Sequence, residues 1–456
     1  MKRFLCFLSL LVGASFAFGQ EIYFNDGLAG YWTGALIRGG NSIQIIEAEF
    51  FEEADTFRVE TSIPDWVYYG PKKSKVKKQG IVLEFDTYYG PAIMVLDTAY
   101  NEMIGSIQTK STPGYEFHLK KSLKPFAPKV IKKDLSFQVE GVRLKGIMYT
   151  PAKNNESLPT AIFVGGRGCG NGNWLSYRGK LLAEYGMTCI SIQERGDIDT
   201  GTDCLDMTHD QEVEDLATII DQVSKFKEVD ATRLGLITYS AGGWIGPAVT
   251  QLPNSEVDWI VTVVGPATSV KQQQLDGARY YSKQDNYSEL GAEQVLAYTE
   301  LLFQDRDTTE LHAELEILLK DATKEKWINW LEETDIAATP SDIEKLWVRR
   351  YDFDPAEALR DFKGPFLSLL GEKDFVVPYA EQIEALQAAF GPVGKTNYRV
   401  VILPGAGHGM EHGPTFRNWI WVRPIQARPY YFKYDRVAHG AIAEILKFLE
   451  DFEILK

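Results

Sequence analysis

The chain has few cysteines and histidines, four and six among its 456 residues. None of them recur at a spacing typical of a metal site, so no metal is expected. Cys189 lies in an apolar segment at residues 187–192 and is predicted to be an inert core thiol. Cys169 and Cys204 follow predicted strands at the same edge of a sheet. An oxidising compartment would allow them to pair, but sequence does not give the Cα separation that a disulfide requires, so the pairing stays open.

An excess of basic residues is also absent. The chain has 48 Lys and Arg against 63 Asp and Glu, with a formal net charge of −15. Nucleic acid and anionic membrane surfaces attract basic proteins, so neither is expected as a partner. After the N-terminus no apolar run approaches the roughly 18 residues that span a bilayer, so no stable membrane insertion is expected.

The one pronounced apolar run lies at the start of the chain. Lys2 and Arg3 precede an apolar stretch at residues 4–18, and the sequence Ala-Phe-Gly at 17–19 suits a signal peptidase. This pattern is typical of a cleaved signal peptide, which we predict at residues 1–19. The protein is therefore expected to be secreted or periplasmic.

Residues 20–126 are predicted to form a small β-rich module. Short strand-like segments separated by Gly, Pro and Asp lie at 43–50, 80–86, 92–96 and 115–119. Such breaks between short strands are typical of an all-β domain. The lysine-rich segment 72–78 is predicted to be a solvated loop, and the module contains no apparent catalytic group.

From residue 127 strands alternate with helices. Strand-like segments lie at 135–139, 142–149, 161–164, 187–192, 234–237, 259–264, 365–370 and 398–403. Helical segments lie at 174–185, 210–226, 380–390 and 438–452. This alternation predicts a doubly wound, mostly parallel sheet of the α/β class.

Residues 266–355 interrupt the alternation. They are mostly polar, with predicted helices at 290–303, 309–319, 324–330 and 341–349. A long insertion between sheet strands is usually functional. Trp327, Trp330 and Trp347 are predicted mainly to pack this insertion, and a substrate-facing position is the alternative.

The prediction of function depends on Ser240. An apolar strand at 234–237 runs into the sequence Thr-Tyr-Ser-Ala-Gly-Gly at 238–243, and a helix begins near Trp244. The two glycines lack the Cβ that would clash in so sharp a turn. Such a turn exposes the serine hydroxyl at the sheet edge, in front of a helix N-terminus. It resembles the Gly-x-Ser-x-Gly nucleophile elbow of the α/β-hydrolase family, with Thr238 in place of the first glycine.

Two further loops resemble that family. Residues 165–170 stand where the family carries its His-Gly-x-Gly oxyanion loop, with Gly165 in place of the histidine, and residues 194–196 resemble its Asp-x-Arg-Gly turn. The resemblance covers residues 127–456. It implies an α/β-hydrolase domain with a helical cap at about 266–355, and an oxyanion hole made by the backbone N–H groups of Ala241 and Arg167. The Arg167 side chain has two possible roles, which the sequence does not separate. It could bind a substrate carboxylate or phosphate, or it could form a structural salt bridge.

A serine nucleophile needs an adjacent base, and the base needs a group that orients it. Ser240, Asp374 and His408 each follow a predicted strand, in the order of the α/β-hydrolase triad. His412 is the alternative base, although His408 fits better the tight turn after the last strand. Glu372 is the alternative acid, although Asp374 matches the family position before the sequence Phe-Val-Val-Pro.

These residues predict a secreted serine hydrolase that cleaves small carboxylic esters through an acyl-enzyme, with no cofactor. An aminopeptidase, an acyl-peptide hydrolase and a thioesterase are alternatives that the core alone does not separate. A catalytically inactive binding protein is the alternative from another class, and Thr238 and Gly165 are its only support. The sequence leaves the oligomeric state open.

Overall fold

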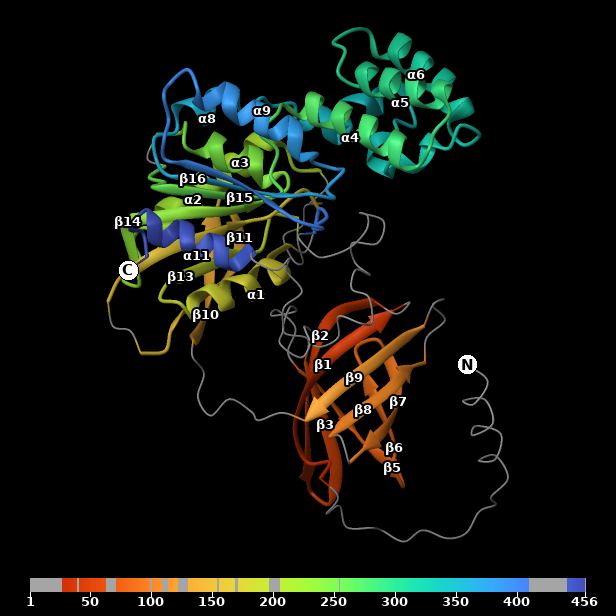
Figure 1. Ribbon diagram of the computed structural model, residues 1–456, viewed down its shortest axis with the longest axis vertical. Coiled ribbons are helices and arrows are strands. Elements are labelled where there is room, and N and C mark those ends of the chain that lie inside the picture. The colour runs from red at the N-terminus through yellow and green to blue at the C-terminus, as the bar shows by residue number, and fades with distance from the viewer. Residues whose placement is uncertain are drawn as a thin grey trace.

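The computed structural model describes residues 27–38, 41–62, 71–98, 101–108, 114–121, 130–153, 156–168, 171–196, 206–253, 255–409 and 441–455. The predicted signal peptide, the predicted domain boundary at 126–127, Cys169, Cys204 and His412 lie outside these residues. The described strands form two sheets that share no strand (Figure 1). No helix in the described ranges is long and apolar enough to cross a membrane.

The first sheet is antiparallel, with the strand order β4-β3-β2-β1-β9-β8-β7-β6-β5. Its strands are β1 (Gly30–Arg38), β2 (Asn41–Glu53), β3 (Thr56–Ser62), β4 (Lys72–Lys75), β5 (Lys77–Gln79), β6 (Val82–Thr87), β7 (Gly90–Asp97), β8 (Glu102–Ile107) and β9 (Tyr115–Lys121). One face buries an aromatic group in which Trp32 and Phe85 both meet the ring of Phe50 edge-on, at 6.4 and 5.6 Å between centroids. The sheet bears out the predicted β-rich character of this region.

The lysine-rich segment was wrongly predicted to be a loop. It forms β4 and β5, which pair with β3 and β6 at the two ends of the strand order. The side chains of Ser74 and Val76 are buried between lysines that stay exposed or half-buried. This alternation is the two-residue period of a strand, and the high lysine content concealed it in the sequence.

The second sheet has the order β10-β11-β13-β12-β14-β15-β16-β17. Its strands are β10 (Val130–Val139), β11 (Val142–Pro151), β12 (Leu158–Val164), β13 (Thr188–Ile192), β14 (Val229–Tyr239), β15 (Trp259–Val263), β16 (Phe366–Gly371) and β17 (Tyr398–Leu403). The hairpin β10–β11 and the pair β11–β13 are antiparallel, and all other neighbours are parallel. The predicted mostly parallel, doubly wound sheet is confirmed.

Helices cover both faces of this sheet (Figure 1). One face packs against α1 (Asn171–Ala183) and α11 (Ala441–Asp451). The other packs against α2 (His209–Val223), α3 (Gly242–Val249), α8 (Ala356–Asp361) and α9 (Tyr379–Phe390). Successive residues of β14 point to opposite faces of the sheet. Ile237 packs in the core with α1 and α11, and Leu236 packs in the core with α2, α3, α8 and α9. Cys189 is a fully buried free thiol in the first core, as predicted.

A helical insertion lies between β15 and α8. It contains α4 (Val270–Gln284), α5 (Glu289–Leu301), α6 (Thr308–Ala322), α7 (Trp347–Arg350) and the short 3-10 turns η2 (Trp327–Trp330), η3 (Glu333–Asp335) and η4 (Pro340–Lys345). The sequence predicted α5 and α6 but not α4, whose run of glutamines and central Gly277 hid its few apolar positions. The helix predicted at 324–330 is only the turn η2.

Candidate active site

Ser240 stands in a sharp turn between β14 and α3. Its φ of 49° lies in the left-handed region, and its N–H donates to Val263 O at 3.1 Å on the neighbouring strand. A non-glycine residue in this conformation costs on the order of 1–3 kcal/mol and is typical of functional sites. A Cβ on Gly242 would lie 2.6 Å from Gly165 O, and one on Gly243 would lie 2.7 Å from Gly265 Cα. Both glycines are therefore required for α3 to start this close to the sheet.

The structure gives a reason why Thr238 is tolerated where the family pattern has glycine. The side chain of Thr238 is fully buried against α3. A Cβ on Gly246, one turn into that helix, would lie 2.7 Å from Thr238 Cγ2. The helix α3 therefore has a glycine, Gly246, opposite Thr238. This glycine leaves room for the threonine side chain, so the turn at Ser240 keeps its shape.

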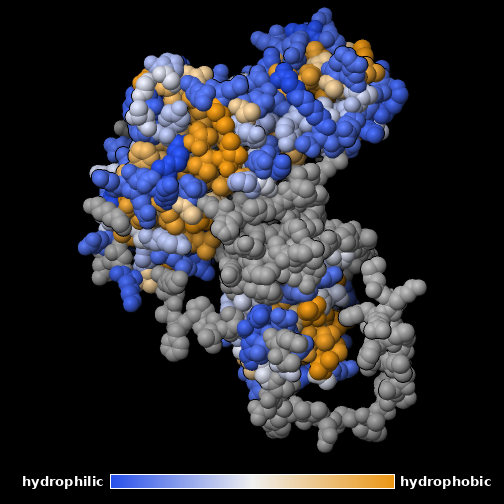
Figure 2. Space-filling model, viewed as in Figure 1, coloured by the Kyte–Doolittle hydropathy of each residue, from blue (hydrophilic) through white to orange (hydrophobic). Residues whose placement is uncertain are grey.

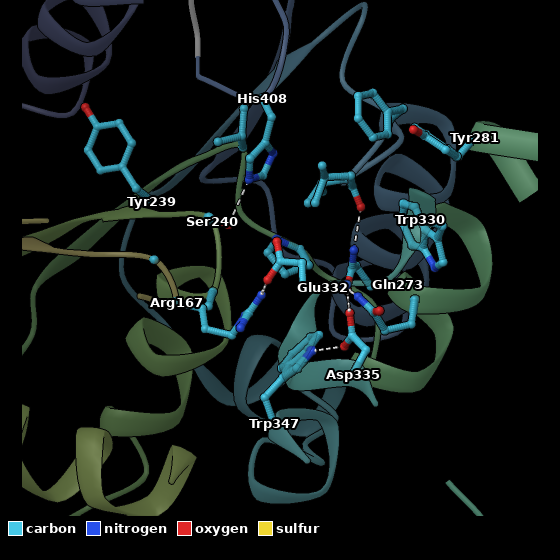
Figure 3. Close-up of a pocket in the computed structure, with 18 of the residues that line it drawn as sticks. Arg167, Tyr239, Ser240, Gln273, Tyr281, Trp330, Glu332, Asp335, Trp347 and His408 are labelled. Carbon is cyan, nitrogen blue, oxygen red and sulfur yellow. Dashed lines mark hydrogen bonds and ion pairs between the residues drawn. The ribbon is translucent and has the colours of Figure 1, made fainter. Parts of the chain in front are cut away.

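The three residues predicted as a triad lie in one hydrogen-bonded chain. Ser240 Oγ is 2.9 Å from His408 Nε2 (Figure 3), and His408 Nδ1 is 2.9 Å from Asp374 Oδ2. Asp374, in the turn after β16, is 1% exposed, and its Oδ1 accepts from the N–H groups of Val376 and Val377 at 2.9 and 3.0 Å. The carboxylate is thus fixed by its own loop, with one oxygen left for the imidazole.

Glu372, the alternative acid, is used elsewhere. Its Oε2 accepts from the N–H of Gly405 at 2.8 Å, in the turn that leads from β17 to His408. It supports the loop that carries the histidine, while Asp374 is the carboxylate bonded to the ring.

The glycine-rich loop after β12 passes directly over the serine. A Cβ on Gly166 would lie 2.8 Å from Ser240 Cβ, so no larger residue fits without displacing the serine. Arg167 follows Gly166 in this loop, and Ala241 follows Ser240 at the start of α3. Both line the same cavity as the Ser240 hydroxyl. The two predicted oxyanion residues therefore flank the serine from different elements.

The Arg167 side chain connects this loop to the helical insertion. Its guanidinium lies 4.5 Å from the ring centroid of Trp347, donates to Thr334 Oγ1 at 3.3 Å and forms an ion pair with Glu332 (Figure 3). Of its two possible roles, the structure shows the salt bridge. We call this group of four residues the Arg167 clasp.

A cavity of about 630 Å³ opens at Ser240 and His408. Residues of the sheet edge form one side of it, and residues of the insertion form the other. Several lining side chains were not predicted from the sequence, namely Gln273, Gln274, Tyr281, Asp335 and Phe375. Gln273, Gln274 and Tyr281 lie on α4, a helix that the sequence pattern did not predict. Phe375 follows Asp374 directly, and that adjacency was the available signal.

Asp335 is a buried acid among the residues that line the cavity on the insertion side, at 7% exposure. Its carboxylate accepts from Trp347 Nε1 and from the N–H of Glu332, the latter at 2.8 Å. Burial raises the pKa of this carboxyl above its ordinary value, and its hydrogen bonds oppose the shift. Asp335 thus fixes Trp347 and, through it, the surface on which Arg167 lies.

The three tryptophans of the insertion have different positions. Trp327 is fully buried and donates to Gln294 Oε1 at 3.1 Å, so its predicted packing role is confirmed. Trp330 and Trp347 line the cavity, so for these two the alternative, a cavity-facing position, is the one observed.

The strand order of the second sheet, its hairpin start and the serine turn after β14 are those of the α/β-hydrolase fold. No protein-family model and no curated protein matches the sequence. Similar solved structures include an α/β hydrolase from Penicillium sp. sh18, with 16% identity, a TM-score of 0.43 and coverage of 71% of this chain and 97% of that one. An esterase from Pyrococcus furiosus has 15% identity, a TM-score of 0.43 and coverage of 73% and 96%. A protein described as a dipeptidyl aminopeptidase IV, from Bacteroides ovatus, has 14% identity, a TM-score of 0.42 and coverage of 89% and 50%.

Proposed function

We propose that this protein is a serine hydrolase that cleaves carboxylic esters through an acyl-enzyme. The observation that carries the proposal is the chain Ser240–His408–Asp374, with both hydrogen bonds at 2.9 Å, at the mouth of a cavity large enough for a small organic substrate. Serine is a poor nucleophile by itself, and a histidine in hydrogen-bonding reach supplies the base that it needs.

In the first step Ser240 Oγ attacks the ester carbonyl while its proton passes to His408 Nε2. Asp374 accepts the hydrogen bond from Nδ1, which keeps Nε2 free as base and stabilises the imidazolium that forms. The tetrahedral intermediate collapses as His408 returns the proton to the leaving alcohol. A water molecule activated by His408 then attacks the acyl group and releases the acid.

The backbone N–H groups of Ala241 and Arg167 would donate to the oxyanion. Loss of one such donor typically raises the barrier by about 3–4 kcal/mol. The close passage of Gly166 over Ser240 supports this assignment, because it brings the N–H of the next residue near the reacting carbonyl.

The state of the acidic groups favours an ester over an aminopeptidase substrate. A free substrate amine would have to compete for a carboxylate that is already engaged. Glu332 is paired with Arg167, and both oxygens of Asp335 accept hydrogen bonds from within the insertion. An ester has no charge that requires such a partner.

The proposal also includes the predicted cap, the two predicted domains and the predicted signal peptide. The insertion at about 266–355 acts as a cap over the site, the N-terminal module covers residues 20–126, and the hydrolase domain covers 127–456. The signal peptide at 1–19 directs the protein to the periplasm or the exterior, which disfavours coenzyme A thioesters as substrates.

The test is turnover of p-nitrophenyl esters and aminoacyl-p-nitroanilides by the wild type and Ser240→Ala. We expect ester hydrolysis that falls by a factor of roughly a thousand or more in the variant, and labelling of the wild type alone by a fluorophosphonate. Turnover confined to the anilides would replace the esterase with an aminopeptidase. Absence of turnover and of labelling would leave the inactive binding protein.

A further inference from the structure

Three aromatic rings from separate segments meet at one end of the cavity. Tyr281 comes from α4, Trp330 from the end of η2, and Phe375 from the residue after Asp374. The ring centroid of Tyr281 lies 5.5 Å from that of Trp330 and 5.3 Å from that of Phe375, with the planes tilted by 44° and 45°. Figure 3 shows Tyr281 and Trp330 across the cavity from Ser240 and His408. We call these three residues the aromatic wall.

The position of Trp330 is fixed by the backbone of α4. A Cβ on Gly277 would lie 2.6 Å from Trp330 Cη2, so the indole occupies the space that any other residue would fill. Trp330 is nevertheless only half-buried. Among the described residues, none accepts a hydrogen bond from its indole N–H. The ring is therefore held in place and still accessible from the cavity.

The polar side chains next to the aromatic wall are uncharged. Gln273 donates to Val376 O, Gln274 donates to Gln273 Oε1 at 2.8 Å, and Asn329 donates to Lys326 O at 3.1 Å. The charged groups Arg167 and Glu332 pair with each other. Asp335, the other acid among the described lining residues, already accepts hydrogen bonds from Trp347 Nε1 and from the N–H of Glu332, so the surface beside the wall favours a neutral group.

We propose that Tyr281, Trp330 and Phe375 form a subsite for an uncharged aromatic ring of the ester substrate. The inference rests on the proposed function, because the ring would lie in the same cavity as the ester carbonyl that Ser240 attacks. Aromatic pairs prefer tilted or offset arrangements with centroids 4.5–7 Å apart, the geometry that the wall already has among its own members. The gain over a saturated ring of similar size corresponds to about threefold to tenfold in affinity.

The experiment compares esters that differ only in the aromaticity of one ring. Ethyl 3-phenylpropanoate and ethyl 3-cyclohexylpropanoate carry the ring in the acyl part, and 2-phenylethyl acetate and 2-cyclohexylethyl acetate carry it in the alcohol part. The two members of each pair have nearly equal intrinsic reactivity and similar hydrophobic bulk. We expect kcat/KM to favour the phenyl member of one pair by about threefold to tenfold, and that pair assigns the wall to the acyl or the alcohol side.

Variants test whether the wall causes the preference. Trp330→Leu should bring the phenyl-to-cyclohexyl ratio close to one, and Trp330→Phe should restore most of it. Gly277→Ala gives the same loss by a different route: alanine favours the helix, so α4 is retained while its Cβ displaces the indole. Tyr185→Leu, at an exposed tyrosine outside the cavity, is the control and should leave the ratio unchanged.

A binding measurement separates this proposal from the catalytic one. Calorimetric titration of Ser240→Ala with the phenyl and cyclohexyl members of both pairs gives the ratios of dissociation constants without turnover, and Ser240→Ala combined with Trp330→Leu gives their dependence on the wall. Equal binding of both rings, or a preference that survives Trp330→Leu and Gly277→Ala, overturns the subsite even if Ser240 is the nucleophile. A Trp330-dependent preference for phenyl supports the subsite even if no ester is hydrolysed.

Discussion

The cavity has two unlike sides. On the sheet side, Ser240, Asp374 and His408 each stand in the turn that follows a strand, and parallel strands bring their carboxyl ends to one edge. On the insertion side, Tyr281 comes from the helix α4, Trp330 from the turn η2 and Trp347 from the short helix α7, which are positioned by side-chain contacts. Under the proposed function, the fold would supply the reaction geometry and the insertion would supply the surface that selects the substrate.

The two sides are joined at the Arg167 clasp. Arg167 belongs to the loop over the serine, and the residues that hold its side chain, among them Glu332 and Trp347, belong to the insertion. If the sides have separate roles, changes on the sheet side should lower the rate for all esters. Changes on the insertion side should alter substrate preference. Changes at the Arg167 clasp should lower the rate of ester hydrolysis, but by less than changes on the sheet side.

The largest effect in this comparison is expected for Asp374→Asn. The asparagine oxygen can still accept from Val376 and Val377, but its NH2 then faces His408 Nδ1 and forces the wrong imidazole tautomer. We expect kcat for a p-nitrophenyl ester to fall by a factor of about 10³–10⁴, with the fold unchanged. Glu372→Gln is the matched control, because its amide oxygen can still accept from Gly405. Similar losses in both variants would show that Asp374 has no special role in orienting the base.

An intermediate effect is expected for Arg167→Met. Loss of the guanidinium frees the loop from Trp347 and Thr334, and a displaced oxyanion donor weakens stabilisation of the tetrahedral intermediate. We expect kcat to fall by about tenfold, less than for complete loss of a donor, with a small change in KM. Steady-state kinetics on a short acetate ester measure this split.

Glu332→Gln is the control for the clasp. The Glu332 side chain is 58% exposed, and ion pairs at exposed positions contribute little. We expect its kcat within about twofold of wild type. An Arg167→Met enzyme with wild-type kcat would show that the two sides are not coupled through this residue.

The smallest effect concerns a second contact between the core and the insertion. Tyr351, just after α7, donates a hydrogen bond from its hydroxyl to Glu212 of α2, and burial raises the pKa of Glu212 from its ordinary value of 4.5 to about 7. Between these two pKa values the native state holds a proton that the unfolded chain releases. Glu212 therefore makes the free energy of unfolding fall as pH rises through this window.

Glu212→Gln should remove this dependence and keep an acceptor for Tyr351. We expect the variant to be more stable than wild type by about 1–3 kcal/mol at pH 8 and nearly equal to it at pH 4.5. Urea unfolding at the two pH values measures the difference. Glu214, an exposed acid of the same helix, is the control, and Glu214→Gln should show no such pH-dependent gain. An equal effect of Glu212→Gln at both pH values would contradict the assignment.

Much of the reaction geometry was predictable because local patterns encode it. Alternating strands and helices gave the mostly parallel sheet, the two glycines after Ser240 gave the sharp turn, and loops after later strands gave Asp374 and His408. These features depend on spacing, on residue size at a turn and on chain order. A single sequence displays all three.

The tertiary structure decided the rest, because it depends on residues that are distant in the chain. Gly246 compensates for Thr238 only because α3 packs back on β14, and Gly277 receives Trp330 only because α4 and η2 lie together. The lysine-rich segment forms the strands β4 and β5 because it pairs with β3 and β6. The sequence by itself determined where Ser240, His408 and Asp374 stand. Packing between remote segments determined the aromatic wall and the clasp that face them, since the contacts that fix those side chains form only when the chain is folded.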